Sequence, residues 1–151
     1  SAGKPFKFCA KKEWNGDFTN LGAEDTGYTV ADNNCTVAET GVYTIVVDIK
    51  GAKITIAKAE VFGIGDAFGS WDAGKYPFTI NEDGTATITT AAAGNLRMYT
   101  AVPGVDWWQA EYNIYDGKIQ YRGEGGDQAA VAVAANAVVT VNFNAGTGEI
   151  K

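Results

Sequence analysis

The chain has 151 residues, of which 46% are hydrophobic and 20% are charged, as in an ordinary globular protein. Its formal net charge is −6, and its twelve lysines and arginines are scattered, which excludes the basic stripe that nucleic-acid binding requires. It has no histidine, so the commonest general base, the commonest metal ligand and every Ser-His-Asp arrangement are absent.

The sequence contains no membrane-spanning segment, because no stretch approaches the roughly 18 consecutive apolar residues that one needs. The opening residues SAGKPFKF lack the apolar centre of a signal peptide. If the protein is exported, we expect its signal and any lipid anchor to lie outside this sequence. Cys9 and Cys35 are either a disulfide pair or two buried thiols, and their spacing does not decide between these.

Strand periodicity begins at residues 6–9, where apolar residues alternate with polar or small ones. Residues 42–49 continue it with β-branched side chains, and Tyr43, Ile45 and Val47 share one face. A turn at Lys50-Gly51 leads into residues 53–56, which we expect to return as the hairpin partner.

The second part of the chain repeats this pattern of short strands and turns. Strands are predicted at residues 60–64, 76–80, 85–90, 96–100, 118–121, 130–134 and 138–144, with a last hairpin closing at Ile150. Turn residues separate these strands every ~8–12 positions, and helical signals are weak. The predicted fold class is therefore an all-β, antiparallel β-sandwich.

Two parts of the sequence match each other at a spacing of about 90 to 96 residues. Residues 6–10 align with 96–100, and residues 41–48 align with 137–144. This predicts a complete module at residues 59–151, preceded at residues 1–58 by the second half of a related one. Half a sandwich leaves unpaired edges and an uncovered apolar face. Either the segment comes from a longer parent, or it packs against the complete module as one unit.

Aromatic residues beside cations are the candidate binding residues. Arg97 and Tyr99 lie on one strand face, just before a loop that ends at Trp107 and Trp108. The apolar CH face of a sugar stacks on such rings, while its hydroxyl groups need donors and acceptors around the rim. If their segment is extended, the two tryptophans point to opposite faces, so that one belongs to the core and the other is available.

Four further residues could join such a site. Trp71 either stacks on a sugar or seals the end of the sandwich, and Trp14 either binds or packs. Lys7 occupies the position equivalent to Arg97, and for both the alternative is an ordinary solvated face. Tyr115 belongs to the tyrosine-rich stretch 111–122, whose alternative is a half-buried hairpin.

Catalysis and metal binding have little support. A glycosidase needs two carboxylates some 5 to 10 Å apart, one of them with a raised pKa, and a small sandwich offers little room for such a cleft. No EF-hand spacing exists, and the glycine-rich residues 123–127 lack the features of a phosphate loop. We expect no catalytic residue, no metal and no cofactor.

Three motifs resemble those of a known family. IGDAFGSWD at residues 64–72 resembles the "IGDAT-x-GGWD" opening of modules in SusE/SusF-like outer-membrane glycan-binding lipoproteins of Bacteroides-type bacteria. The Phe-Lys-Phe strand at residues 6–8, with its downstream Trp14, is similar to their FKF…W element. ETGVYTIVVDIKGAKITI at residues 39–56 resembles their closing strands. Together the motifs cover most of the chain in the family order.

The resemblance implies tandem immunoglobulin-like modules on the cell surface that bind starch or another polysaccharide without catalysis. It also implies work beside a TonB-dependent transporter and other surface lipoproteins. By position, the implied sugar residues are Arg97, Tyr99, Trp107 and Trp108, with Lys7 and Trp14 in the partial module. Leu-Arg-Met replaces Phe-Lys-Phe at residues 96–98, and three residues are inserted before the tryptophan pair. The alternative function is a structural spacer with no glycan site.

Overall fold

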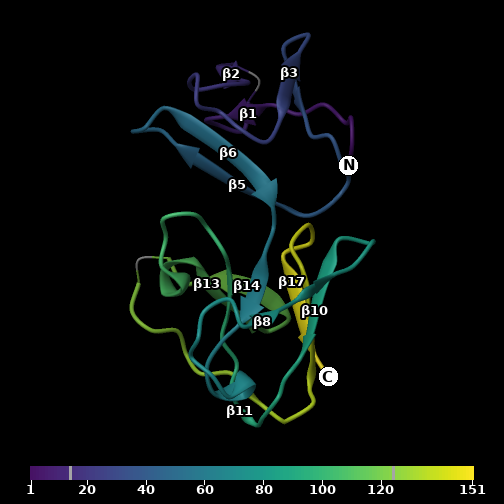
Figure 1. Cartoon of the computed structure of the whole chain (residues 1–151), viewed down its shortest axis with the longest axis vertical. Helices are drawn as coiled ribbons and strands as arrows, with labels where there is room; N and C mark the ends of the chain where they lie inside the picture. The colour runs from purple at the N-terminus through teal and green to yellow at the C-terminus, as the bar shows by residue number, and fades with distance from the viewer. Residues whose placement is uncertain (14, 124) are drawn as a thin grey trace. The chain divides into compact units, whose positions relative to one another are not determined.

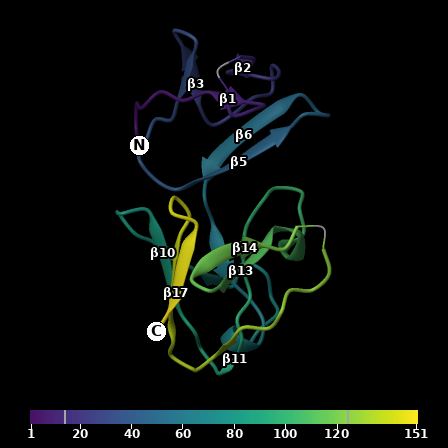
Figure 2. The same ribbon diagram turned by 180° about the vertical axis from the view of Figure 1, so that it is seen from behind.

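The computed structural model describes residues 1–13, 15–123 and 125–151. The chain divides into two compact units, Ser1–Lys58 and Ala59–Lys151 (Figure 1 and, from behind, Figure 2). The assignment of the first unit as half a module stays a prediction.

The first unit consists of three antiparallel hairpins. These are β1 (Phe8–Cys9) with β2 (Asp17–Phe18), β3 (Thr29–Ala31) with β4 (Asn34–Thr36), and β5 (Tyr43–Asp48) with β6 (Lys53–Lys58). The predicted hairpin around Gly51 is therefore present, and the Asp48 carboxylate accepts a hydrogen bond from the Gly51 N–H at 2.8 Å within the turn.

The core of the first unit lies on one face of the β5–β6 hairpin. Ile54 and Ile56 are buried there, and aromatic rings from the other hairpins pack against them. Phe8 and Phe18 stack with their ring centroids 5.5 Å apart. Cys35 is also buried, and both it and Cys9 are free thiols.

The second unit is built on one nine-stranded antiparallel sheet with the order β8-β7-β12-β13-β14-β17-β16-β10-β9. Its strands are β7 (Val61–Gly63), β8 (Tyr76–Pro77), β9 (Thr79–Ile80), β10 (Thr85–Thr89), β12 (Met98–Thr100), β13 (Glu111–Tyr115), β14 (Lys118–Tyr121), β16 (Val138–Asn142) and β17 (Thr147–Ile150). A separate pair joins β11 (Gly94–Asn95) to β15 (Ala132–Val133), and two 3-10 helices are present, η1 (Asp66–Phe68) and η2 (Trp107–Ala110).

This sheet is rolled into two layers. Its edge strands β8 and β9 lie at opposite ends of the strand order, yet only Phe78 separates them in sequence. One residue spans at most about 3.6 Å, so the two edges must come together and the sheet encloses a core. Leu96 and Met98 are buried in that core, on the opposite side of the strand from Arg97 and Tyr99, which the sequence predicts to share one face. The all-β antiparallel fold class is confirmed.

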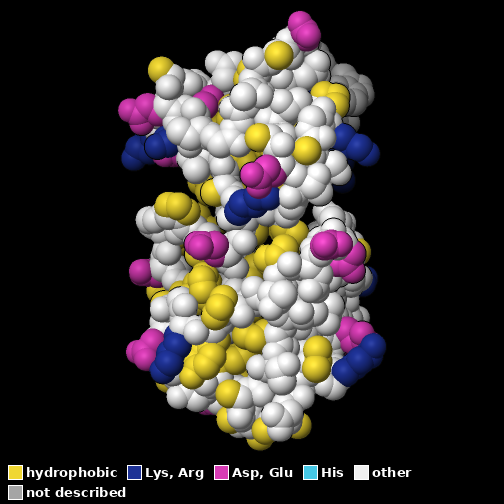
Figure 3. Space-filling model, turned by 45° about the vertical axis from the view of Figure 1, so that its right-hand side comes forward, with side chains coloured by type: hydrophobic (Ala, Val, Ile, Leu, Met, Phe, Trp, Pro, Cys, Tyr) yellow, Lys and Arg dark blue, Asp and Glu magenta, His cyan; other side chains and the backbone are white. Residues whose placement is uncertain are grey.

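On the face drawn in Figure 3, charged side chains form isolated spots and small groups of mixed sign. Hydrophobic side chains reach the surface of the second unit at several points.

The longest helix in the described ranges has four residues and is too short to cross a bilayer.

Candidate functional site

The outer face of four neighbouring strands carries the candidate site. β7, β12, β13 and β14 are consecutive in the sheet, and the register pairs Tyr99 with Phe62 on one side and with Glu111 on the other. The Arg122 N–H donates to the Glu111 carbonyl at 2.9 Å, so Arg122 lies beside Glu111 on the far side from Tyr99. Because alternate strand residues face opposite sides, Met98 points into the core while the side chains of Tyr99 and its cross-strand neighbours face outward.

Four aromatic rings on this face contact one another in succession. We call Phe62, Tyr99, Trp107 and Trp71 the aromatic row. Its ring centroids are 5.5 Å apart between Phe62 and Tyr99, and 6.2 Å apart between Tyr99 and Trp107. Those of Trp107 and Trp71 are 6.1 Å apart, with their planes inclined by 54°. Tyr99 is only 4% exposed but Trp71 is 55% exposed, so the row ends as an aromatic surface in solvent.

Trp107 and Trp108 belong to the 3-10 helix η2, so the extended geometry considered from the sequence is wrong. Successive side chains in such a helix are about 120° apart rather than on opposite faces. Trp107 is half-buried in the aromatic row, and Trp108 is 38% exposed. The helix is fixed at its start, where the Asp106 N–H donates to Gln109 Oε1 at 3.2 Å.

The loop after β7 places Trp71 over Gly65. The Gly65 N–H donates to the Ser70 carbonyl at 2.7 Å, which closes this loop. Gly65 has a φ of 89°, and a Cβ built there would lie 3.3 Å from the Trp71 ring. Glycine is therefore required twice, for its backbone conformation and for the close approach of the indole. Beyond this contact Trp71 is 55% exposed, so about half of its ring is open to solvent.

Two tyrosines hold loops against the sheet. The Tyr99 hydroxyl accepts a hydrogen bond from the Gly74 N–H at 2.7 Å, and burial raises the pKa of Tyr99. The Tyr115 hydroxyl donates to the Ala129 carbonyl at 2.6 Å, and burial likewise raises the pKa of Tyr115. Both side chains thus fix the loops that border the aromatic row.

Two arginines and two carboxylates form an ion network beside the aromatic row. Arg97 Nη1 lies 2.9 Å from Glu111 Oε1, and Arg122 Nη1 lies 2.7 Å from Glu111 Oε2. Asp127 accepts two further bonds from Arg97, at 2.8 and 2.6 Å. This paired geometry raises the pKa of Arg97 and lowers the pKa of Asp127. Glu111 is 1% exposed, and its buried carboxylate is paired with both arginines.

Each arginine also lies against a tryptophan. Arg97 Cζ is 5.7 Å from the ring centroid of Trp71, and Arg122 Cζ is 5.4 Å from that of Trp108. Both distances fall within the range of cation–π attraction. The ion network therefore supports two separate exposed indoles.

The structure brings most of the predicted site residues into one region. Trp71, Trp107, Tyr99 and Arg97 are in mutual contact through the aromatic row and the cation–π pair. Lys7 belongs to the first unit, where its ammonium pairs with Asp17 at 2.7 Å. Trp14 lies outside the described residues.

Three residues of the network were not identified from the sequence, namely Glu111, Arg122 and Asp127. One signal was available for Arg122, because the chain contains only two arginines and both lie in this unit. Asp127 belongs to the glycine-rich residues 123–127, which we considered as a phosphate loop and set aside. In the described part of the chain, no three acidic or cysteine side chains gather as a metal site.

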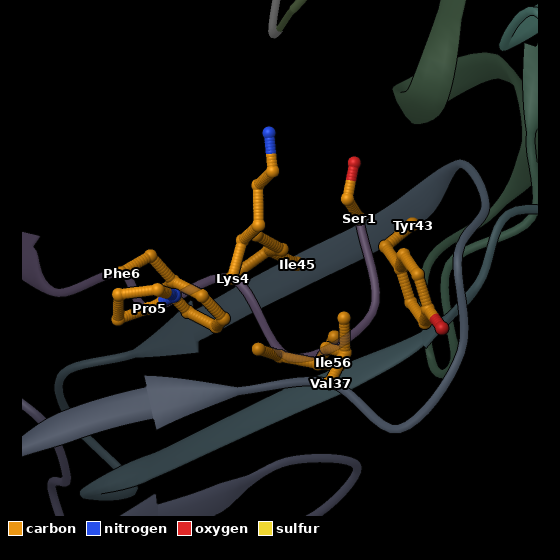
Figure 4. Close-up of a pocket in the computed structure, with 8 residues that line it drawn as sticks. All are labelled: Ser1, Lys4, Pro5, Phe6, Val37, Tyr43, Ile45 and Ile56. Atoms are coloured by element: carbon orange, nitrogen blue, oxygen red, sulfur yellow. The ribbon is translucent and has the colours of Figure 1, made fainter.

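The first unit contains a cavity of about 240 Å³ beside β5 and β6. It is lined by Ser1, Lys4, Pro5, Phe6, Val37, Tyr43, Ile45 and Ile56 (Figure 4). The Lys4 ammonium points away from Val37 and Ile56, so the cavity walls are mainly apolar. Such a lining lacks the converging polar groups that orient a sugar.

A rolled antiparallel sheet that presents inclined tryptophans beside arginine has the architecture of a carbohydrate-binding module. Residues 60–149 match a family model described as SusF/SusE starch specific CBMs. The chain belongs to this SusF/SusE family, as its motifs predicted.

Relatives of known name extend this finding to the whole chain. Over a 169-residue alignment that covers 100% of this chain, it is 32% identical to the outer membrane protein SusF of Bacteroides thetaiotaomicron, of which it covers 35%. The crystal structure of SusF from that organism superposes with a TM-score of 0.85 at 29% identity, covering 100% of this chain and 38% of the other. The chain thus spans about a third of the length of these relatives. The name of the relative agrees with the outer-membrane location that we expected.

Proposed function

We propose that the second unit binds the α-glucan chains of starch without cleaving them, through Trp71 and Trp107. The supporting observation is the pair of rings 6.1 Å apart and inclined by 54°, with Trp71 more than half exposed. Sugar CH faces stack on indoles, and rigid rings lose little entropy on binding. Two inclined rings suit the curved, helical chain of an α-1,4-glucan, whereas a flat β-1,4-glucan favours coplanar rings.

The other predicted residues have supporting roles in this proposal. Tyr99 and Tyr115 fix the borders of the site through the hydrogen bonds to Gly74 and Ala129. Arg97 directs Nη1 and one Nη2 hydrogen to described carboxylates, and an arginine has five N–H donors. Its Nε–H and second Nη2 hydrogen have no acceptor among the described residues, and we assign them to sugar hydroxyls at the edge of Trp71. Trp108 provides a second stacking surface.

A non-catalytic role is supported by the state of Asp127. A glycosidase needs a general acid with a raised pKa, whereas the hydrogen bonds from Arg97 lower the pKa of Asp127. Its neighbour Glu111 is buried between two arginines, with 1% of its surface exposed. Neither carboxylate is placed to protonate a glycosidic oxygen.

For the whole protein we propose a place at the outer-membrane surface, in a Sus-like glycan uptake system. A TonB-dependent transporter and other surface lipoproteins would be its partners, with membrane contact through a lipid anchor alone. This part of the proposal rests on the family and on the name of the SusF relative. Lys7 and Trp14 stay predictions for a sugar contact of the first unit.

The test is calorimetry and affinity electrophoresis with amylopectin, maltoheptaose, cellohexaose and xyloglucan. We expect binding to the two α-glucans only, its loss in Trp71→Ala/Trp107→Ala, and no release of reducing ends. The matched control is Tyr43→Ala, an aromatic deletion in the first unit, which should retain α-glucan binding. If no polymer binds, the alternative function as a structural spacer is favoured instead. An unchanged affinity in the double variant would refute the assigned site.

A further inference from the structure

The only two arginines of the chain converge on a single glutamate. Arg97 Nη1 donates to both carboxylate oxygens of Glu111, at 2.9 and 3.2 Å, and Arg122 Nη1 donates to Oε2 at 2.7 Å. Fourteen residues separate Arg97 from Glu111 in sequence, and eleven separate Arg122 from it. Glu111 is 1% exposed, so a sugar in the solvent-facing site cannot reach its carboxylate. Glu111 can therefore affect sugar binding only through the two arginines that it contacts.

Each partner lies against a different exposed indole. Arg97 lies against Trp71 and Arg122 against Trp108, at 5.7 and 5.4 Å from Cζ to the ring centroid. A guanidinium is planar, and charge-assisted hydrogen bonds fix the orientation of its plane. Asp127 also pairs with both arginines, at 2.6 Å from Arg97 and 3.3 Å from Arg122, but Glu111 is the buried carboxylate of the two.

We propose that Glu111 is the positioning residue of the binding surface, which couples Trp71 and Trp108 into one extended glucan site. This rests on the proposed function, because it assumes that both indoles stack on sugar. Asp127 contributes less, since its carboxylate is 59% exposed and water can replace it. A glucan long enough to reach both indoles then depends on Glu111 more strongly than a short one that contacts Trp71 alone.

The first test compares Glu111→Gln with Glu149→Gln, the same chemical change at an exposed ion pair of this unit. We expect Glu111→Gln to weaken maltoheptaose binding about tenfold, because neutral hydrogen bonds hold a guanidinium less firmly than charged ones do. Maltotriose binding should weaken less, and Glu149→Gln should bind both as the parent does. Equal losses for the long and the short glucan would overturn the coupling of the two indoles.

The second test is a double-mutant cycle, which separates positioning from a general structural role. In an Arg97→Met/Arg122→Met background, Glu111→Gln should cause no further loss of maltoheptaose affinity, because the groups that it positions are gone. An additional loss of the full size would refute the proposal, since Glu111 would then act independently of both arginines.

The third test needs no ligand. Nitrogen NMR of the guanidinium groups gives two signal sets, one for each arginine, and we expect hindered rotation in both. Glu111→Gln should release both, while Asp127→Asn should loosen mainly Arg97. Free rotation in the parent protein would overturn the proposal, even if Glu111→Gln does not fold. Hindered rotation without any glucan binding would instead support the positioning and refute the proposed function, so the two failures are distinguishable.

Discussion

The β5–β6 hairpin of the first unit and the β16–β17 hairpin of the second have matching sequences but different surroundings. Ile45 on β5 aligns with Val141 on β16, yet Ile45 is 48% exposed and Val141 is fully buried. The two strands also differ in their neighbours within the sheet. β16 has β10 on its other side, where Ala86 pairs with Val141, whereas β5 pairs with β6 alone among the described residues. The same strand pattern therefore carries a core residue in the second unit and a half-exposed residue in the first.

The basic residues of the two units show a similar contrast. Tyr99 pairs with Glu111 across β12 and β13, and at the aligned positions Cys9 pairs with Asp17 across β1 and β2. The preceding basic residue contacts this acid in both units, since Lys7 pairs with Asp17 at 2.7 Å. Only in the second unit is the acid fully buried and shared by two cations. The same register thus produces a simple ion pair in one unit and a four-residue network in the other.

The strongest test of the difference between the two hairpins is a charged residue at each of the two aligned positions. Val141→Asp should lower the free energy of unfolding of the second unit by more than about 4 kcal/mol, because it buries an unpaired carboxylate. Ile45→Asp should cost less than about 1 kcal/mol, since solvent already reaches that side chain. Urea denaturation followed by circular dichroism measures both. Equal costs would mean that β5 is covered as completely as β16.

The difference between the two basic residues predicts a smaller effect on stability. Arg97→Lys should destabilise the second unit by about 2 kcal/mol, because an ammonium cannot reproduce the two-carboxylate geometry of the guanidinium fork. Lys7→Arg should change stability by less than about 0.5 kcal/mol, since that pair is single. Thermal denaturation of the two variants against the parent measures the difference. A neutral Arg97→Lys would show that the network contributes no more than the pair.

Two glycines of one loop test the placement of Trp71. Gly65→Ala and Gly69→Ala both force alanine into a positive φ, of 89° and 70°, but only the first brings a Cβ to 3.3 Å from the Trp71 ring. Gly69→Ala should lose about 1 kcal/mol of stability through its left-handed backbone, and Gly65→Ala should lose more, because its ψ of −153° lies in a region that is essentially restricted to glycine. Only Gly65→Ala should also weaken glucan binding, by calorimetry, because it displaces the indole. Equal affinities in the two variants would contradict this contact.

The smallest effect concerns two carboxylates whose pKa values are lowered by different means. Partial burial would raise the pKa of Asp25, but hydrogen bonds from Ile54, Leu21 and Gly22 N–H groups outweigh it and lower the pKa. For Asp127, the Arg97 guanidinium is the main cause of the lowering. Both groups therefore stabilise the protein above the unfolded aspartate pKa of about 3.9. This stability is lost as the pH falls through each folded value.

Salt should separate these two carboxylates. Added sodium chloride should raise the pKa of Asp127 toward its ordinary value, because this exposed ion pair is screened, while Asp25 with its neutral donors should hardly move. A carbon NMR titration of the carboxyl groups at low and high salt measures both. The same salt shift at the two sites would contradict the assigned causes.

The sequence by itself determined most strands of the second unit, the inward side chains of residues 96–98 and the family, but it missed β2, β3 and β4 of the first unit. Alternation predicts which of Leu96, Arg97 and Met98 face the core, because a strand has a fixed period of two. The three motifs at residues 6–14, 39–56 and 64–72 together identified the family, because each is contained in one continuous segment. Local rules were sufficient for both.

Only the tertiary structure decided how the site is assembled. It closed the sheet by bringing β8 and β9 together, placed Trp107 and Trp108 on a 3-10 helix, and buried Glu111 between both arginines. The Arg97–Asp127 contact joins residues thirty positions apart. Such contacts depend on how loops return to the sheet, and the periodicity of a single strand carries no information about that. The physical reason is the same for Ile45 and Val141, since the burial of each is set by its neighbours in space.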